Sequence, residues 1–95
     1  MLTMRTSSGL DDRRKRALLR TWRRGTRELD IIFGLFANAE IETMSDADLD
    51  ELERLLDCED PNLQKWFMGQ EPVLPEFLTP LFARIVAFRG ANPIG

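Results

Sequence analysis

The chain has 95 residues and a hydrophobic content of 43%, which suits one compact domain around a small core. It has no histidine, which excludes histidine-based triads and histidine metal sites, and its single cysteine, Cys58, excludes an internal disulfide and indicates a reducing compartment. The net charge of −3 conceals an asymmetry, because residues 1–27 carry nine basic and two acidic side chains whereas residues 28–60 carry one basic and twelve acidic.

A basic first helix is predicted from Asp11 onward, after a disordered leader over residues 1–10. Gly25 is expected to end it, with Arg23 and Arg24 offsetting the negative helix end. Its apolar stripe is Ala17, Leu18, Leu19 and Trp22. The charge asymmetry fits two readings: this helix lies against an acidic third helix, or it meets a charged partner.

The second predicted helix is the most apolar. Leu29, Ile32, Phe33 and Phe36 recur with the i, i+3, i+4, i+7 spacing of a buried face. The longest apolar run, residues 31–37, is far shorter than the roughly 20 residues that span a bilayer, so no membrane insertion is expected.

The third and fourth helices carry clear start signals. Ser45 is expected as N-cap, with Asp48 completing a capping box and Met44 packing on Leu49. In the fourth helix Asp60 is expected as N-cap, and Pro61 occupies the first position, where its missing N–H costs nothing. Leu63, Trp66 and Phe67 form its inner face, and Gly69 ends it.

Residues 70–79 are predicted to cross the surface irregularly, because prolines restrain the residues before them. A last helix should start with Thr79 as N-cap and Pro80 in the first turn, and end at Arg89-Gly90. Its apolar stripe is Leu81, Phe82, Ile85 and Val86. The sequence therefore predicts an all-α fold, a small five-helix bundle with a helical domain over residues 11–90 and a loose tail over residues 91–95.

Groups suited to catalysis are scarce. Cys58 follows a leucine-lined helix, where a buried thiol is the ordinary role, and it has no histidine to activate it. The sequence contains no glycine-rich phosphate loop or cysteine cluster, and the Glu59-Asp60 pair lacks the further oxygen ligands of a metal site. We expect neither an enzyme nor a metal centre.

The densest charge surrounds the junction of the first two helices. Arg24 and Glu28 lie four residues apart around Gly25, and Arg23, Arg27 and Asp30 add three charges. The segment can be a capped turn with solvated charges. It can equally be an exposed corner, where Gly25 lets a partner backbone approach and Arg24 and Glu28 give directional hydrogen bonds. The spacing leaves both interpretations open.

Two segments together carry a resemblance to a known family. Arg23-Arg24-Gly25-Thr26-Arg27-Glu28-Leu29-Asp30 resembles the Arg-Gly-x-x-Glu motif of the succinate dehydrogenase assembly factors, also called flavinators or FAD assembly factors. The run Leu55-Leu56-Asp57-Cys58-Glu59-Asp60-Pro61-Asn62-Leu63-Gln64-Lys65-Trp66 resembles that family's leucines, Cys-acid-Asp-Pro step and downstream Trp. The likeness covers roughly residues 10–90, and it departs at Asn62, where an acid is common, and around Pro80 and Gly90.

The resemblance implies an assembly chaperone that binds the flavoprotein subunit of succinate dehydrogenase, or of fumarate reductase, and promotes covalent attachment of FAD to a histidine of that partner. No cofactor is expected to bind tightly to this chain itself. The resemblance implies partner-binding residues in the first motif and structural residues in the second: Arg23, Arg24, Gly25, Arg27, Glu28 and Asp30, then Asp60, Pro61 and Trp66. A bacterial member would be cytoplasmic, a eukaryotic one mitochondrial, and a monomer is expected.

Two other functions fit single features of the sequence. The basic first helix, with Trp22 for stacking, could bind nucleic acid in an antitoxin-like regulator, but the second helix is apolar and acidic where a recognition helix should be basic. A flavin carrier would need a phosphate-binding loop, which the sequence lacks.

Overall fold

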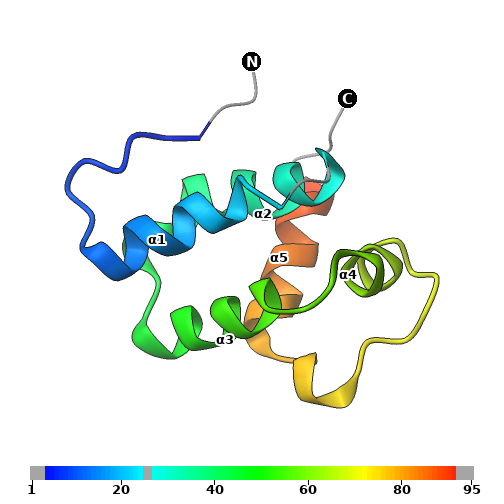
Figure 1. Ribbon diagram of the computed structural model, residues 1–95. Coiled ribbons are helices and arrows are strands. Elements are labelled where there is room, and N and C mark those ends of the chain that lie inside the picture. The colour runs from blue at the N-terminus through cyan, green and yellow to red at the C-terminus, as the bar shows by residue number, and fades with distance from the viewer. Residues whose placement is uncertain (1–3, 25–26, 92–95) are drawn as a thin grey trace.

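The structure, a computed structural model, describes residues 4–24 and 27–91, together with the side chains of all of these except Ala91. Helices are the only regular elements in the described ranges, which confirms the all-α prediction (Figure 1). In chain order they are α1 (Asp12–Thr21), α2 (Arg27–Glu40), the 3-10 helix η1 (Ile41–Thr43), α3 (Asp46–Leu56), α4 (Asp60–Phe67), the 3-10 helix η2 (Pro75–Phe77) and α5 (Pro80–Ala91).

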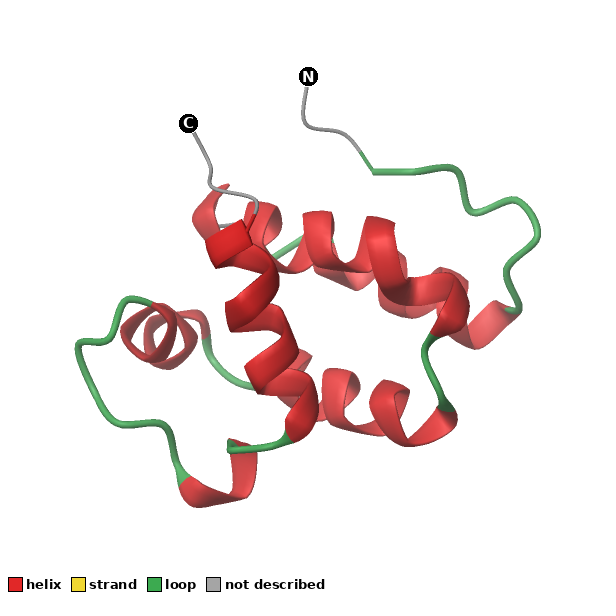
Figure 2. Cartoon of the chain, turned by 180° about the vertical axis from the view of Figure 1, so that it is seen from behind, coloured by secondary structure: helices red, strands yellow, loops and turns green. Residues whose placement is uncertain are grey.

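Helix α2 lies at the centre of the bundle and packs against α1, α4 and α5 (Figures 1 and 2). Seven of its residues are buried, as its apolar periodicity predicts. Phe33 contacts Phe67 of α4 edge to face, with ring centroids 5.4 Å apart, and Phe36 meets Phe88 of α5 at 5.7 Å. The start of α2, which follows the charged junction, is therefore held by the core.

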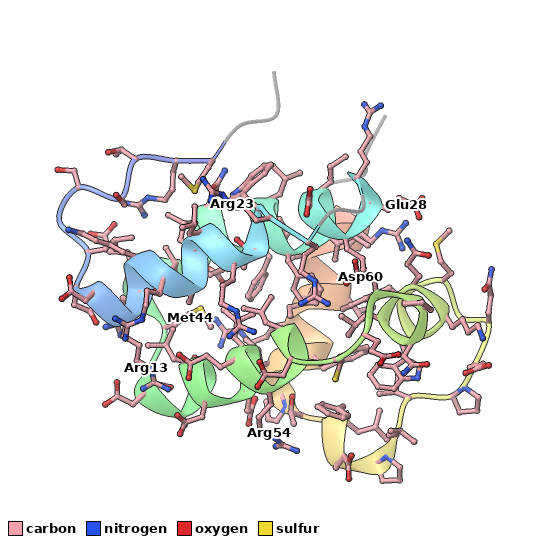
Figure 3. The ribbon with its side chains drawn as sticks, viewed as in Figure 1. Arg13, Arg23, Glu28, Met44, Arg54 and Asp60 are labelled. Atoms are coloured by element: carbon pink, nitrogen blue, oxygen red, sulfur yellow. The ribbon has the colours of Figure 1, made fainter. Side chains whose placement is uncertain are left out.

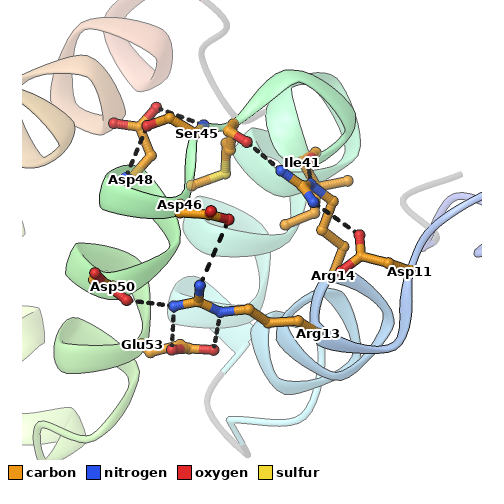
Figure 4. Close-up of polar contacts among 10 residues, drawn as sticks. Asp11, Arg13, Arg14, Ile41, Ser45, Asp46, Asp48, Asp50 and Glu53 are labelled. Carbon is orange, nitrogen blue, oxygen red and sulfur yellow. Dashed lines mark hydrogen bonds and ion pairs between the residues drawn. The ribbon is translucent and has the colours of Figure 1, made fainter.

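Local signals define most helix ends as predicted. The Asp48 N–H donates to the Ser45 hydroxyl while the Ser45 N–H donates to the Asp48 carboxylate, which confirms the capping box (Figure 4). Thr79 caps α5, because its hydroxyl accepts the Phe82 N–H at 3.1 Å. Gly69 has φ +72°, and the next residue, Gln70, donates to the Lys65 carbonyl, so the glycine closes α4 in a left-handed turn.

Several predicted details are wrong. Helix α1 ends at Thr21, before Gly25, which was expected to end it. Asp60 is the first residue of α4 rather than its N-cap; Glu59 holds the cap position and makes no side-chain cap bond. Leu19 and Val86 are exposed. The buried face of α1 is formed by Ala17, Leu18 and Thr21, and that of α5 by Leu81, Phe82 and Ile85. Helix α5 also continues through Gly90 to Ala91.

The segment before α1 has no helix, but it is attached to the bundle. Leu10 is buried in the core, and the Arg5 N–H donates to the Asn38 side-chain oxygen at 2.9 Å. Described residues 4–10 thus pack on the bundle where a disordered leader was expected.

The basic α1 does lie against the acidic α3. Arg13 bonds both oxygens of Glu53 and reaches Asp50 (Figure 4). Arg20 contacts Asp57 at 2.7 Å. Much of the charge asymmetry is therefore neutralised inside the chain. None of the described helices has the length and apolar character needed to cross a bilayer.

Candidate functional site

The junction between α1 and α2 carries the charged segment. We call its described charged members the corner: Arg23, Arg24, Arg27, Glu28 and Asp30. Gly25, also expected to contact a partner, lies outside the described residues, as does Thr26. The corner divides into side chains that face solvent and side chains that face the bundle.

Arg23, Arg27 and Glu28 are exposed to solvent, as a partner-binding surface requires. Figure 3 labels Arg23 and Glu28. None of the three forms an ion pair with another described residue. Glu28 lies in the first turn of α2, where the positive end of the helix dipole favours a carboxylate. The exposed part of the corner thus offers two cations and one anion to a second molecule.

Arg24 turns inward instead. Only 9% of its side chain is exposed, and the guanidinium donates to the Leu56 carbonyl, to the Cys58 carbonyl at 2.6 Å and to the Asp60 carboxylate at 2.5 Å. Leu56 is the last residue of α3, so Arg24 satisfies carbonyl groups that a helix end leaves without partners. The guanidinium also lies 6.0 Å from the centre of the Phe33 ring.

This geometry differs from the directional partner contact expected of Arg24. Its two terminal nitrogens bond two carbonyls and a carboxylate of the same chain, and its Nε is buried without a partner, so Arg24 has little capacity left for a second molecule. The structure gives Arg24 the role of joining the α1–α2 junction to the α3–α4 junction. The link connects the two sequence motifs, since Asp60 belongs to the second.

Asp30 also acts within the chain. Its carboxylate accepts the Arg24 backbone N–H at 2.7 Å, which ties the end of the α1 segment to the first turn of α2. The carboxylate makes this a charge-assisted hydrogen bond, which is stronger than a neutral one. Asp30 therefore stabilises the corner through a bond within the chain.

A close contact that the sequence analysis missed positions the same junction. The Trp22 indole lies on Gly34 of α2, where an added Cβ would come within 2.4 Å of the Trp22 ring. The indole N–H donates to the Asn38 side-chain oxygen at 3.2 Å. A glycine inside an apolar helix is the signal that could have found this contact, because such a glycine costs helix stability without a packing reason.

The residues of the second motif, Asp60, Pro61 and Trp66, make contacts within the bundle. Pro61 lies in the first turn of α4, and Trp66 is buried against Phe77 of η2 with ring centroids 5.4 Å apart. These contacts fix α4 and the irregular segment after it. They hold Asp60 where Arg24 reaches it.

The described residues were expected to hold neither a metal centre nor an activated cysteine. No group of three metal-ligating side chains occurs among them. Burial raises the pKa of the Cys58 thiol, and the nearby Arg24 charge only partly opposes that shift. The thiol is therefore protonated at neutral pH, which disfavours a nucleophilic role.

Comparison with known proteins identifies similar chains. The family described as "Flavinator of succinate dehydrogenase" matches residues 15–89. The chain is 39% identical to the FAD assembly factor SdhE of Acetobacter pasteurianus over 74 residues, which cover 78% of this chain and 68% of the relative. The FAD assembly factor SdhE of Shewanella oneidensis is 47% identical over 64 residues, covering 67% of this chain and 73% of the relative.

A eukaryotic protein is similar as well. The mitochondrial succinate dehydrogenase assembly factor 2 of Mycosarcoma maydis is 35% identical over 69 residues, covering 73% of this chain but only 29% of that longer protein. No solved structure gives a significant match.

Proposed function

Because the chain belongs to the family of succinate dehydrogenase flavinators, we propose that it binds the flavoprotein subunit of succinate dehydrogenase, or of fumarate reductase, and promotes covalent attachment of FAD to a histidine there. The family match over residues 15–89 carries this proposal. The histidine must belong to the partner, since this chain has none. FAD is likewise carried by the partner, and the chain acts as a chaperone and not as an enzyme.

In this proposal one set of corner residues contacts the partner and a second set stabilises the corner internally. Arg23, Arg27 and Glu28 contact the flavoprotein, and Gly25 between them allows close approach of its backbone. Arg24 and Asp30 hold that surface in shape from inside. A preformed surface loses less conformational entropy on binding, so the internal bonds support affinity without touching the partner.

Promotion of flavinylation then follows from binding. The chain stabilises the conformation of the flavoprotein in which its histidine and the FAD are correctly oriented, and orientation alone lowers a reaction barrier substantially. No proton transfer by this chain is required.

The test is co-expression with a flavoprotein subunit, read as covalent flavin fluorescence on a denaturing gel. Glu28→Ala and Gly25→Arg should lower the fluorescence while the variants stay folded by circular dichroism. Glu76→Ala is the matched control, because Glu76 is also exposed but lies on η2, away from the corner (Figure 1). Unchanged flavinylation with folded Glu28→Ala and Gly25→Arg would rule out the corner as the binding surface.

A further inference from the structure

The solvent-facing side of α1 carries a row of basic residues around one apolar side chain. Lys15, Arg16, Arg20 and Arg23 are exposed, and Leu19 lies among them with 38% of its surface exposed. The spacing of Arg16, Leu19 and Arg23 places them along one line of the helix surface and its following turn. We call these five residues the α1 face.

Most of the charge on the α1 face is not neutralised by the chain. Lys15, Arg16 and Arg23 make no ion pair with any residue in the described ranges, and Arg20 makes one exposed pair with Asp57. Exposed pairs of that kind contribute little to stability. The other flank of α1 differs, because Arg13 and Arg14 bond acidic and carbonyl groups of the bundle (Figure 4). The α1 face is therefore a basic surface left over after internal pairing.

The surface is hollowed at its C-terminal end. An open hollow is lined by Leu19, Arg20, Arg23 and Arg24. Arg24 is a fixed part of the wall, because its guanidinium is bonded to the α3–α4 junction and paired with Asp60. Arg20 and Arg23 add two exposed cations, and Leu19 with the arginine stems adds apolar surface.

We infer that this hollow accepts a carboxylate side chain from an acidic surface of the flavoprotein subunit. The inference rests on the proposed function and adds a second contact to it. The hollow shares Arg23 with the exposed part of the corner, so one partner surface can cover both. The exposed guanidinium groups of Arg20 and Arg23 beside the apolar side chain of Leu19 match the charged head and aliphatic stem of a glutamate.

An acidic protein surface fits this face better than nucleic acid does. Helix α1 has ten residues and is about 15 Å long, and the exposed carboxylates of Asp50 and Asp57 lie beside it on α3. Duplex DNA carries one negative charge about every 1.7 Å, so DNA on the α1 face would bring phosphates near Asp57, which pairs with Arg20 of that face. A compact carboxylate group on a protein avoids this repulsion.

Two substitutions at one position test the inference. Leu19→Glu brings a negative charge into the hollow, and Leu19→Lys brings a positive charge of similar size; both should fold, because Leu19 is exposed. We expect Leu19→Glu to weaken binding of the full chain to the purified flavoprotein subunit by about tenfold at low salt, whereas Leu19→Lys retains or strengthens binding. The difference should shrink between about 50 mM and about 300 mM NaCl, because salt screens exposed charges.

The remaining outcomes separate this inference from the proposed function. If the wild type binds the flavoprotein, and Glu28→Ala weakens it, while both Leu19 variants bind like wild type, the hollow plays no part and only the further inference fails. If Leu19→Glu and Leu19→Lys weaken binding equally, the contact at Leu19 is apolar, and the proposed carboxylate contact is wrong. Absence of wild-type binding overturns both proposals, and salt-sensitive binding of a labelled DNA duplex that Leu19→Glu alone abolishes would assign the face to nucleic acid.

Discussion

Arg24 bonds Asp60, which lies 36 positions further along the chain, while the same guanidinium caps the carbonyl end of α3. Two other arginines do similar work: Arg14 bonds the carbonyls of Ile41 and Met44, and Arg89 bonds the Phe67 carbonyl at the end of α4. In each case an arginine from one helix, or from the turn that follows it, closes a distant helix or its adjoining turn. A bundle of this size has only a small hydrophobic core, and these long-range arginine bonds to helix ends add to the contacts that stabilise it.

Arg24→Gln should destabilise the protein by about 2 to 4 kcal/mol, because it leaves the Asp60 carboxylate and two carbonyl groups without the bonds that Arg24 supplies. Urea unfolding followed by circular dichroism measures the change. Arg24→Lys should recover only part of it, since an ammonium group lacks the planar fork that reaches all three acceptors. If Arg24→Gln lowers the free energy of unfolding no more than Arg16→Gln does, at an exposed arginine, the buried contacts of Arg24 are contradicted.

Gly34→Ala should cost about 1 to 3 kcal/mol, because the added methyl group overlaps the Trp22 ring and must displace it. Urea unfolding gives the cost, and Trp fluorescence reports the ring movement. Gly90→Ala is the matched control, since nothing lies within 4 Å of a Cβ there and alanine favours the α5 helix. Stability should therefore fall in the first variant and stay level or rise in the second.

Acid should destabilise the contacts that α3 makes with α1 and with α5. The hydrogen bond from Arg13 is the main cause that lowers the pKa of Glu53 below its ordinary value of 4.5. For Asp48 burial opposes the shift, but bonds from Arg84 and Ser45 outweigh it and the pKa is again lowered. A lowered carboxylate pKa gives stability that is present above the unfolded pKa and is lost as the pH falls through the folded one.

The free energy of unfolding should therefore decline as the pH drops below about 4.5. Urea midpoints at a series of pH values measure this decline, and Arg13→Gln should flatten it, because the variant removes the partner that shifts Glu53. Lys65→Gln serves as control, since its exposed pair with Glu71 carries little energy. An unchanged pH profile in Arg13→Gln would contradict the Arg13–Glu53 bond.

These features show which parts of the structure can be predicted from sequence. The Ser45 box, the Thr79 cap and the Gly69 turn were predictable, because each depends on residues within one helical turn. The inward turn of Arg24 was not, since it depends on the end of α3, which lies more than 30 residues away. In the sequence Arg24 looks like Arg23 and Arg27, and only the packing of α3 and α4 separates them.

The last prediction compares the inward arginine with an outward one. Arg27→Gln should leave the free energy of unfolding unchanged within about 0.5 kcal/mol, because Arg27 is exposed and makes no ion pair with a described residue. Under the proposed function it should still weaken binding to the flavoprotein subunit, measured by titration calorimetry. Arg24→Gln should do the reverse: it lowers stability, and its binding should recover when the protein is assayed cold enough to stay folded. If cold, folded Arg24→Gln still binds as poorly as Arg27→Gln, then Arg24 contributes to partner contact as well as to the internal cap.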